Sequence, residues 1–187
     1  MDKTIVVFRG LPGSGKSTLL RRMGGTLDNT CCTNHYFKDS NEEYIFDSTK
    51  LMEAHNWCRL KCKEMMEKEV PMIFVDNTNI QLWEMVPYVL LAKSFKYKIE
   101  VISVNTNLND EELSLRNKHD VPVDVVSKMR FKFESLDPVD VILREGYDAF
   151  MSIAEEDHVL DLLRGVDIQN LDKGLIAQMH RRKHAKG

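Results

Sequence analysis

The residues from position 10 to position 18 have the types and spacing of a phosphate-binding loop. They read Gly10-Leu11-Pro12-Gly13-Ser14-Gly15-Lys16-Ser17-Thr18 and match the pattern G-x-x-x-x-G-K-[ST] in full. Glycines allow the backbone to wrap so that successive N–H groups point at phosphate oxygens. Lys16 would then bridge the β- and γ-phosphates, and Ser17 would offer its hydroxyl to Mg²⁺. The motif therefore predicts a site for a nucleoside triphosphate and Mg²⁺.

A second acidic group is expected at the end of a neighbouring strand, where it would hold magnesium through water. Asp76 follows the apolar run Pro71–Val75 and fits that role. Asp76 could instead cap the next helix, a role that Asn77 or Asn79 would fill equally well. Both interpretations place Asp76 at the end of a buried strand.

The elements that must position these residues alternate along the chain. The sequence predicts strands at 4–8, 30–33, 71–75 and 97–104, and helices at 16–23, 50–68, 82–94, 110–118 and 123–133. Residues 139–143 and 158–163 are weaker candidates for a strand or a helical turn. Alternating strands and helices predict right-handed βαβ units and a parallel sheet that is covered on both faces. We therefore expect a single α/β domain.

Composition narrows the possible partners. The 187 residues are 43% hydrophobic and 29% charged, with a net charge of -3, which argues against binding nucleic acid mainly through bulk positive charge. No apolar run is long enough for a membrane helix, so we expect no membrane partner. The four cysteines, at 31, 32, 58 and 62, are poorly spaced for a disulfide framework. This pattern favours a cytoplasmic or other intracellular protein, the nucleus included.

Several stretches of the sequence together resemble one known family. They are residues 8–18, 34–37 with 43–47, 53–55, 75–79 with 83–85 and 87–88, and 116–122 with 129–134. This combination resembles the AAA-type P-loop kinases related to Nedd4-binding proteins and to polynucleotide 5′-kinase. The N-terminal part of the cyclic-nucleotide phosphodiesterases of myelin is a more distant relative. The resemblance runs from about residue 4 to about residue 134.

The resemblance implies a fold, an activity and a partner. The fold would be a P-loop NTPase with three α/β/α layers, a parallel sheet and a helical lid. The kinase domain would span 1–150 with its lid near 109–134. The resemblance does not cover the residues beyond 135, and their composition leads us to expect 151–187 to be an extension ending in a basic, flexible tail. The activity would transfer the γ-phosphate of ATP, with Mg²⁺, to a hydroxyl. The acceptor would be a nucleic-acid end or a nucleotide, often a 5′-hydroxyl.

Arginines of the lid follow from the same resemblance. Arg116, and with less support Arg130, would neutralise charge that builds on the transferred phosphoryl group. Each could instead be a solvent-facing helix residue. Arg9, just before the phosphate loop, would support the loop or face solvent.

Asn34 departs from the family pattern, which usually has an aspartate at this position to accept the proton of the attacking hydroxyl. An amide is too weak a base for that. The chain could be an inactivated variant, a nucleotide-binding protein with little transferase activity, or an enzyme in which His35 is the base. The first two predict that Asn34→Asp raises transfer. Asn34 could also orient the acceptor, His35 could simply pack beside Tyr36 and Phe37, and the acceptor could be a small metabolite or a modified DNA base.

Other residues have structural interpretations that we favour. His55, Cys58 and Cys62 share one helix face and could bind a metal, but the pattern is more typical of a packed face. Trp57 and Trp83 could stack on bases, although core or interface packing suits helical positions better. The basic run 180–186 is interpreted as a solvated tail rather than a phosphate-binding segment.

Overall fold

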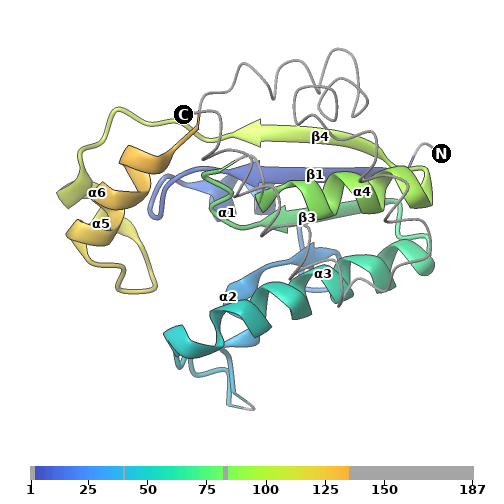
Figure 1. Ribbon diagram of the computed structural model, residues 1–187, viewed down its shortest axis with the longest axis horizontal. Helices are drawn as coiled ribbons and strands as arrows, with labels where there is room; N and C mark the ends of the chain where they lie inside the picture. Colours follow the sequence, from blue (N-terminus) through green and yellow to red (C-terminus); the bar gives the residue numbers. More distant parts are fainter. Residues whose placement is uncertain (1–2, 40, 82–83, 135–187) are drawn as a thin grey trace, which may run out of the picture.

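The computed structural model describes residues 3–39, 41–81 and 84–134, and its centre is a sheet of four strands in the order β2-β3-β1-β4 (Figure 1). The strands are β1 (Thr4–Arg9), β2 (Thr30–Cys31), β3 (Met72–Asp76) and β4 (Lys98–Ser103). All pairings in this sheet are parallel. Because β1 is central, all six of its residues are buried, as expected for an apolar run covered on both faces.

Helices connect and cover these strands. They are α1 (Lys16–Arg22), α2 (Thr33–Tyr36), the 3₁₀ helix η1 (Ser48–Lys50), α3 (Leu51–Glu67), α4 (Val86–Phe95), α5 (Asp110–Arg116) and α6 (Val123–Lys132). Figure 1 shows α5 and α6 beyond the end of the sheet where β1 enters the phosphate loop. These two helices correspond to the segment predicted as the lid, and we keep that name for them.

The alternation of side chains along β1 separates two apolar cores. Ile5 and Val7 face a core built with buried residues of α3 and α4. Val6 and Phe8 face the opposite way and pack with Leu20 of α1. Helices therefore lie on both faces of the sheet, and the predicted three-layer α/β/α fold with a parallel sheet is confirmed.

Some predicted boundaries are wrong. Residue 33 was expected in a strand, but Thr33 begins α2 because its N–H and its hydroxyl both donate to Asn77 Oδ1, at 3.0 Å. The helix expected from residue 82 begins at Val86, with Pro87 in its first turn. The candidates at 139–143 and 158–163, the extension 151–187 and Trp83 lie outside the described residues. Within the described ranges, no helix combines the length and apolar character that crossing a bilayer requires.

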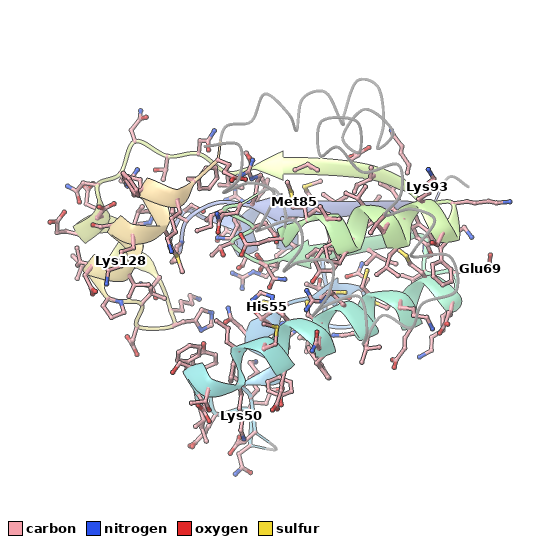
Figure 2. The ribbon with its side chains drawn as sticks, viewed as in Figure 1. Lys50, His55, Glu69, Met85, Lys93 and Lys128 are labelled. Carbon is pink, nitrogen blue, oxygen red and sulfur yellow. The ribbon has the colours of Figure 1, made fainter. Side chains whose placement is uncertain are left out.

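The carboxyl ends of the parallel strands meet at one edge of the sheet, where ligands bind in open α/β folds. In Figure 2, Lys128 on the lid and Lys50 before α3 mark this end of the molecule, whereas Glu69 and Lys93 lie at the other end. The phosphate loop after β1, Asp76 at the end of β3 and the segment after β4 therefore share one end of the sheet.

Candidate nucleotide and acceptor site

The phosphate loop has the backbone that its glycines predict. Gly10, Gly13 and Gly15 have φ of 152°, 75° and 102°, a region that glycine enters without a steric penalty. No side chain caps the N-terminus of α1, so its first N–H groups point into the loop. The hydroxyl of Ser14 is buried without a hydrogen-bond partner among the described residues. These donors suit an anionic ligand.

Lys16 lies beneath the loop, with only 8% of its surface exposed. Its ammonium donates to the carbonyls of Gly10 and Leu11, both at 2.9 Å. An ammonium has three donors, so one stays available for a phosphate oxygen. Burial lowers the Lys16 pKa to about 8, against the opposing influence of Asp76. Lys16 is thus held in the loop by main-chain oxygens.

Ser17 and Asp76 meet where β1 and β3 end side by side. The Ser17 hydroxyl donates to Asp76 Oδ2 at 2.6 Å, and both side chains are at least partly accessible. A hydroxyl and one carboxylate beside a phosphate site are the oxygen donors that Mg²⁺ uses with a nucleotide. Asp76 therefore faces the phosphate loop and does not cap the following helix.

The residues after Asp76 tie the site together. Thr78 O accepts from the N–H of Gly10 at 2.9 Å, which fixes the start of the phosphate loop. Asn79, at a φ of 42°, donates to Phe8 O at 2.7 Å. Because Asn77 holds the start of α2, one short segment joins the loop, β1 and α2. The sequence analysis considered Asn77 and Asn79 only as helix caps and missed these contacts, which join residues far apart in the chain.

Arg9 is a structural support. It is fully buried, and its guanidinium donates to the carbonyls of Asn79, Ile80 and Glu134 at 3.0–3.1 Å. It also lies 4.5 Å from the ring centre of Phe133. Burial lowers its pKa to about 10. Of the two predicted roles, Arg9 supports the loop; it does not face solvent.

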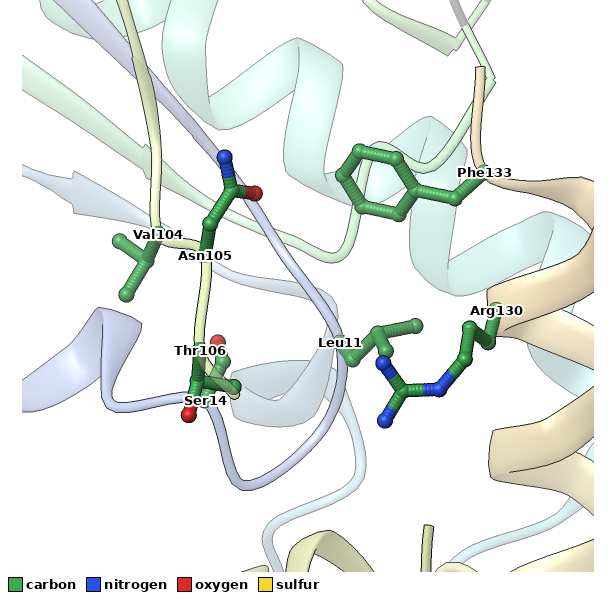
Figure 3. A pocket seen from close by; sticks show the side chains of 7 residues that line it. All are labelled: Leu11, Ser14, Val104, Asn105, Thr106, Arg130 and Phe133. Carbon is green, nitrogen blue, oxygen red and sulfur yellow. The ribbon is translucent and has the colours of Figure 1, made fainter. Parts of the chain in front are cut away.

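A pocket of about 260 Å³ lies beside the phosphate loop (Figure 3). Its lining residues come from the loop, from the segment after β4 and from the end of the lid: Leu11, Ser14, Val104, Asn105, Thr106, Arg130 and Phe133. This volume is below the roughly 300–1,000 Å³ of sites that enclose a drug-sized ligand, so it suits one planar ring system. A guanidinium and a phenyl ring both stack on aromatic bases. The pocket can therefore hold the base of a nucleotide whose phosphates lie in the loop.

The lid rests on the phosphate loop. A Cβ at Gly13 would stand 2.2 Å from the carbonyl oxygen of Leu113 in α5, so only glycine permits this approach. The Leu113 side chain is fully buried with Leu11, Ile80 and Val126. An apolar cluster thus joins α5 and α6 to the loop.

The two candidate lid arginines differ in their surroundings. Arg130 donates to Asp110 Oδ1 at 2.6 Å and to Leu108 O at 2.8 Å, which joins α6 to the start of α5. Arg116 is exposed at the end of α5. Its role at the transferred phosphoryl group stays a prediction.

Asn34, which was predicted to mark the acceptor side, lies in α2 shortly after β2. Its Oδ1 accepts from the Tyr44 hydroxyl at 3.3 Å. The thiol of neighbouring Cys32 has its pKa raised to about 12, chiefly by burial and then by the charge of Asp76. Cys32 also influences the Lys16 ammonium, so α2 begins close to both donor-site charges. The contact of Tyr44 with Asn34 could not be predicted from the sequence, because it depends on the antiparallel bridge that brings Tyr44 back beside Lys38.

His35 is a partly buried ring whose Nδ1 has no hydrogen-bond partner in the described part of the chain. Burial is the main cause that lowers its pKa, followed by the charges of Lys61 and Lys38. Tyr36 and Phe37 beside it pack edge to face with ring centres 5.4 Å apart. The strongest charges on His35 therefore come from outside the phosphate site.

The packed face of α3 is buried as predicted. Cys58 and Cys62 are fully buried against the sheet, and burial lowers the His55 pKa to about 4. Across the described ranges, no three His, Cys, Asp or Glu side chains are grouped to hold a metal ion. The Trp57 ring is partly buried and packs against the main core.

Comparison with known proteins agrees with this architecture. The family described as "AAA domain" matches residues 5–136. NEDD4-binding protein 2 of Homo sapiens is 39% identical over 145 residues, which cover 74% of this chain and 8% of that protein. The chain thus spans a small part of that relative's length. It belongs to the AAA-domain family of kinase-like P-loop proteins.

Proposed function

We propose that this protein is an ATP- and Mg²⁺-dependent kinase that transfers the γ-phosphoryl group to a hydroxyl of a nucleic-acid end or a nucleotide. The proposal rests mainly on the Ser17–Asp76 contact of 2.6 Å beside the buried ammonium of Lys16. An ammonium, a hydroxyl and a carboxylate at the ends of parallel strands suit a magnesium-bound triphosphate. A 5′-hydroxyl end is the first candidate acceptor.

The chain's own residues divide the work between binding and charge stabilisation. The N–H groups of the loop and the Lys16 ammonium bind the phosphates, while Ser17 and Asp76 would hold Mg²⁺. Mg²⁺, when bound, neutralises charge on the β- and γ-phosphates. Arg116 is proposed to reach the γ-phosphate from the lid. The close approach of Leu113 to Gly13 brings the lid onto the phosphate loop, where it would shield the phosphates from water.

Charge on the acceptor side supports a small acceptor. Exposed Asp39, Glu42 and Glu43 lie in the loop between Asn34 and Tyr44 and outnumber the one lysine there, exposed Lys38, which pairs with Glu42. The whole chain carries a net charge of -3. Acidic side chains there disfavour a long polyanion that lies across the loop. They are compatible with one terminal nucleotide or a nucleoside.

A second candidate function is a nucleotide-dependent binding module. The observation that favours it is Asn34, an amide where the family usually has a base. In this alternative, the phosphate loop binds the nucleotide and no phosphoryl group moves. A kinase of a small metabolite or of a modified DNA base is the third candidate.

The proposed function is tested with γ-labelled ATP, Mg²⁺ and a panel of acceptors: 5′-hydroxyl DNA and RNA oligonucleotides, free nucleosides and DNA with modified bases. We expect label on at least one nucleic-acid or nucleoside acceptor, and none with the Lys16→Ala variant. Nucleotide binding without transfer to any acceptor would contradict the kinase proposal and favour the binding module. Transfer only by an Asn34→Asp variant would identify this chain as an inactivated form.

A further inference from the structure

The tip of the lid touches the acceptor side of the site. His119 lies in the turn between α5 and α6, and its ring centre is 4.6 Å from that of Tyr44, at an interplanar angle of 47°. Tyr44 in turn donates its hydroxyl to Asn34 Oδ1. His119, Tyr44 and Asn34 therefore form a continuous row of polar side chains from the lid to the residue that stands where the family usually has its base.

Tyr44 is held firmly enough to fix this row. Its backbone pairs with Lys38 in an isolated antiparallel bridge. Its ring meets buried Phe37 edge to face at 6.2 Å and stacks with Phe46 at 6.4 Å. Such aromatic contacts restrict a side chain beyond what buried area alone does. Tyr44 thus presents its hydroxyl to Asn34 from a packed aromatic cluster.

The turn that carries His119 is ordered by one side chain. Asn117 Oδ1 accepts from the N–H groups of His119 and Val121, both at 3.0 Å. Its Nδ2 donates to Ser114 O at 2.7 Å and to Val121 O at 3.2 Å. Asp120 completes the turn with a φ of 52°. Four hydrogen bonds from Asn117 therefore define the position of the His119 backbone.

The charges that act on His119 include two groups of the donor site, Asp76 and Lys16. Partial loss of hydration is the main cause that lowers its pKa below 6.5, so the imidazole is mostly neutral at pH 7. Among the charged groups, Asp76 has the strongest influence on the His119 pKa. Asp76 and Asp120 raise this pKa, whereas Lys16 and Lys38 lower it. By contrast, Lys61 and Lys38 exert the strongest charges on His35. Asp76 acts on both imidazoles, but only on His119 is it the strongest charge.

We propose that His119 is the general base on the acceptor side, with Asn34 and Tyr44 orienting the acceptor hydroxyl toward it. This inference rests on the proposed kinase function. A neutral ring nitrogen of His119 takes the hydroxyl proton as the acceptor oxygen forms its bond to the γ-phosphorus of ATP. The bond from that phosphorus to the β,γ-bridging oxygen breaks, ADP leaves, and the imidazolium returns its proton to water.

The test compares His119→Ala, His119→Gln and His35→Ala in transfer of labelled γ-phosphate to a 5′-hydroxyl oligonucleotide, across pH 5 to 9. We expect His119→Ala and His119→Gln to lower kcat by about 10²-fold or more, the range of general-base catalysis. His35→Ala should change kcat much less. Added imidazole should restore part of the rate to His119→Ala but not to His119→Gln, in which the side chain still fills the space.

The pH profile separates a base from a purely structural residue. In the unmodified protein the rate should fall as the pH falls through the His119 pKa, below 6.5, because an imidazolium accepts no proton. Both His119 variants should lose this acidic limb. The base role would be overturned if the His119 variants lost most of their rate but kept the acidic limb of the pH profile, and imidazole did not rescue His119→Ala. Unchanged rates in both variants would also overturn it.

A binding measurement gives a readout independent of turnover. The His119 ring resonances are followed by NMR while a 5′-hydroxyl trinucleotide is added to the protein with ADP and Mg²⁺. We expect these resonances to shift and those of His55 to stay unchanged. Transfer by the unmodified protein together with undisturbed His119 would overturn this inference and leave the kinase function intact. Nucleotide binding without transfer to any acceptor would overturn both.

Discussion

The donor side and the acceptor side of the site are built from different kinds of contact. On the donor side, main-chain atoms shape the phosphate loop: its N–H groups, the carbonyls that hold Lys16, and the hydrogen bond from the Gly10 N–H to Thr78 O. The Ser17–Asp76 contact is the side-chain part of that half. On the acceptor side, side chains dominate: Asn34, Tyr44 and His119 come from three separate segments. A backbone site depends on a few glycines and one lysine, whereas a side-chain site can change its chemistry through single substitutions.

This difference explains how one fold can keep nucleotide binding while its acceptor chemistry varies. The start of α2 is anchored by the hydrogen bonds between Thr33 and Asn77, so an amide or a carboxylate at Asn34 would leave this anchor in place. In the proposed kinase, His119 of the lid turn takes the role of the base that an amide at Asn34 cannot fill. The predictions below probe the two sides separately.

The largest effect is expected on the donor side. Lys16→Ala should lower the transfer rate by at least about 10²–10³-fold, because a buried charge that stabilises the moving phosphoryl group is lost. Lys93→Ala, at the other end of the molecule, is the matched control. Initial rates with labelled ATP measure both variants. Equal rates for the two would show that the phosphate loop is not the donor site.

A substitution at Asp76, which pairs with Ser17 at the proposed magnesium site, should show the next largest effect. Asp76→Asn keeps the shape but removes the charge that faces Ser17, so Mg²⁺ affinity should fall by about 10–100-fold. Titration of Mg²⁺ at saturating nucleotide measures the change. Asp39→Asn, in the exposed loop after α2, serves as the control. An unchanged magnesium requirement would exclude Asp76 as a ligand.

Two groups of the acceptor side, Asn34 and His119, can be tested for coupling by a double substitution. Adding Asn34→Asp to His119→Ala should raise transfer by about tenfold or more over His119→Ala alone, because a carboxylate replaces the lost base. The transfer rates of the unmodified protein, the two single variants and the double variant give the coupling energy between Asn34 and His119. If Asn34→Asp has the same effect with and without His119, the two groups do not share a proton.

The contact between lid and loop is tested with two glycines. Gly13→Ala and Gly15→Ala both place a side chain at positive φ, which costs about 1–3 kcal/mol. Only at Gly13 would the new Cβ also meet Leu113 O; at Gly15 it would meet nothing within 4 Å. Urea unfolding without nucleotide should therefore show the larger loss for Gly13→Ala. Equal losses would mean that the lid does not rest on the loop.

The smallest effect is expected from the lid ion pair. Arg130 and Asp110 are partly solvated, with 41% and 22% of their side-chain surfaces exposed. Arg130→Ala should lower the free energy of unfolding by about 0.2–1 kcal/mol, and less at high salt. Lys128→Ala, which breaks a more exposed pair with Asp124, is the comparison. A loss well above this range would assign Arg130 a larger part in holding the lid.

The sequence predicted the parts of the molecule that depend on local pattern. Glycine spacing predicted the phosphate loop, and continuous apolar runs predicted buried strands such as β1 and β3. Asp76 was predicted as a magnesium ligand because it ends a strand beside the loop; Mg²⁺ binding there awaits its test. The features that could not be predicted depend on contacts between residues far apart in the sequence. Thr33, for example, starts a helix because its N–H donates to Asn77, 44 positions away.

On the acceptor side, too, the decisive contacts join residues that are far apart in the sequence. His35 was the only histidine considered as a base, because it is adjacent to Asn34 in the sequence. His119 was part of the stretch that resembles the family, yet nothing local relates residue 119 to residue 44. Their contact requires both the lid turn ordered by Asn117 and the loop that returns through the Lys38–Tyr44 bridge.

The most direct test of the account is how the protein divides the γ-phosphoryl group between an added hydroxyl and water. Labelled ATP and Mg²⁺ are incubated with a 5′-hydroxyl oligonucleotide or with free nucleosides, and label is measured on each acceptor and in inorganic phosphate. We predict more label on at least one of these acceptors than in phosphate, with both products strongly reduced by Lys16→Ala. Label that appears only in phosphate, or stays in ATP, with every one of these acceptors would contradict the kinase proposal.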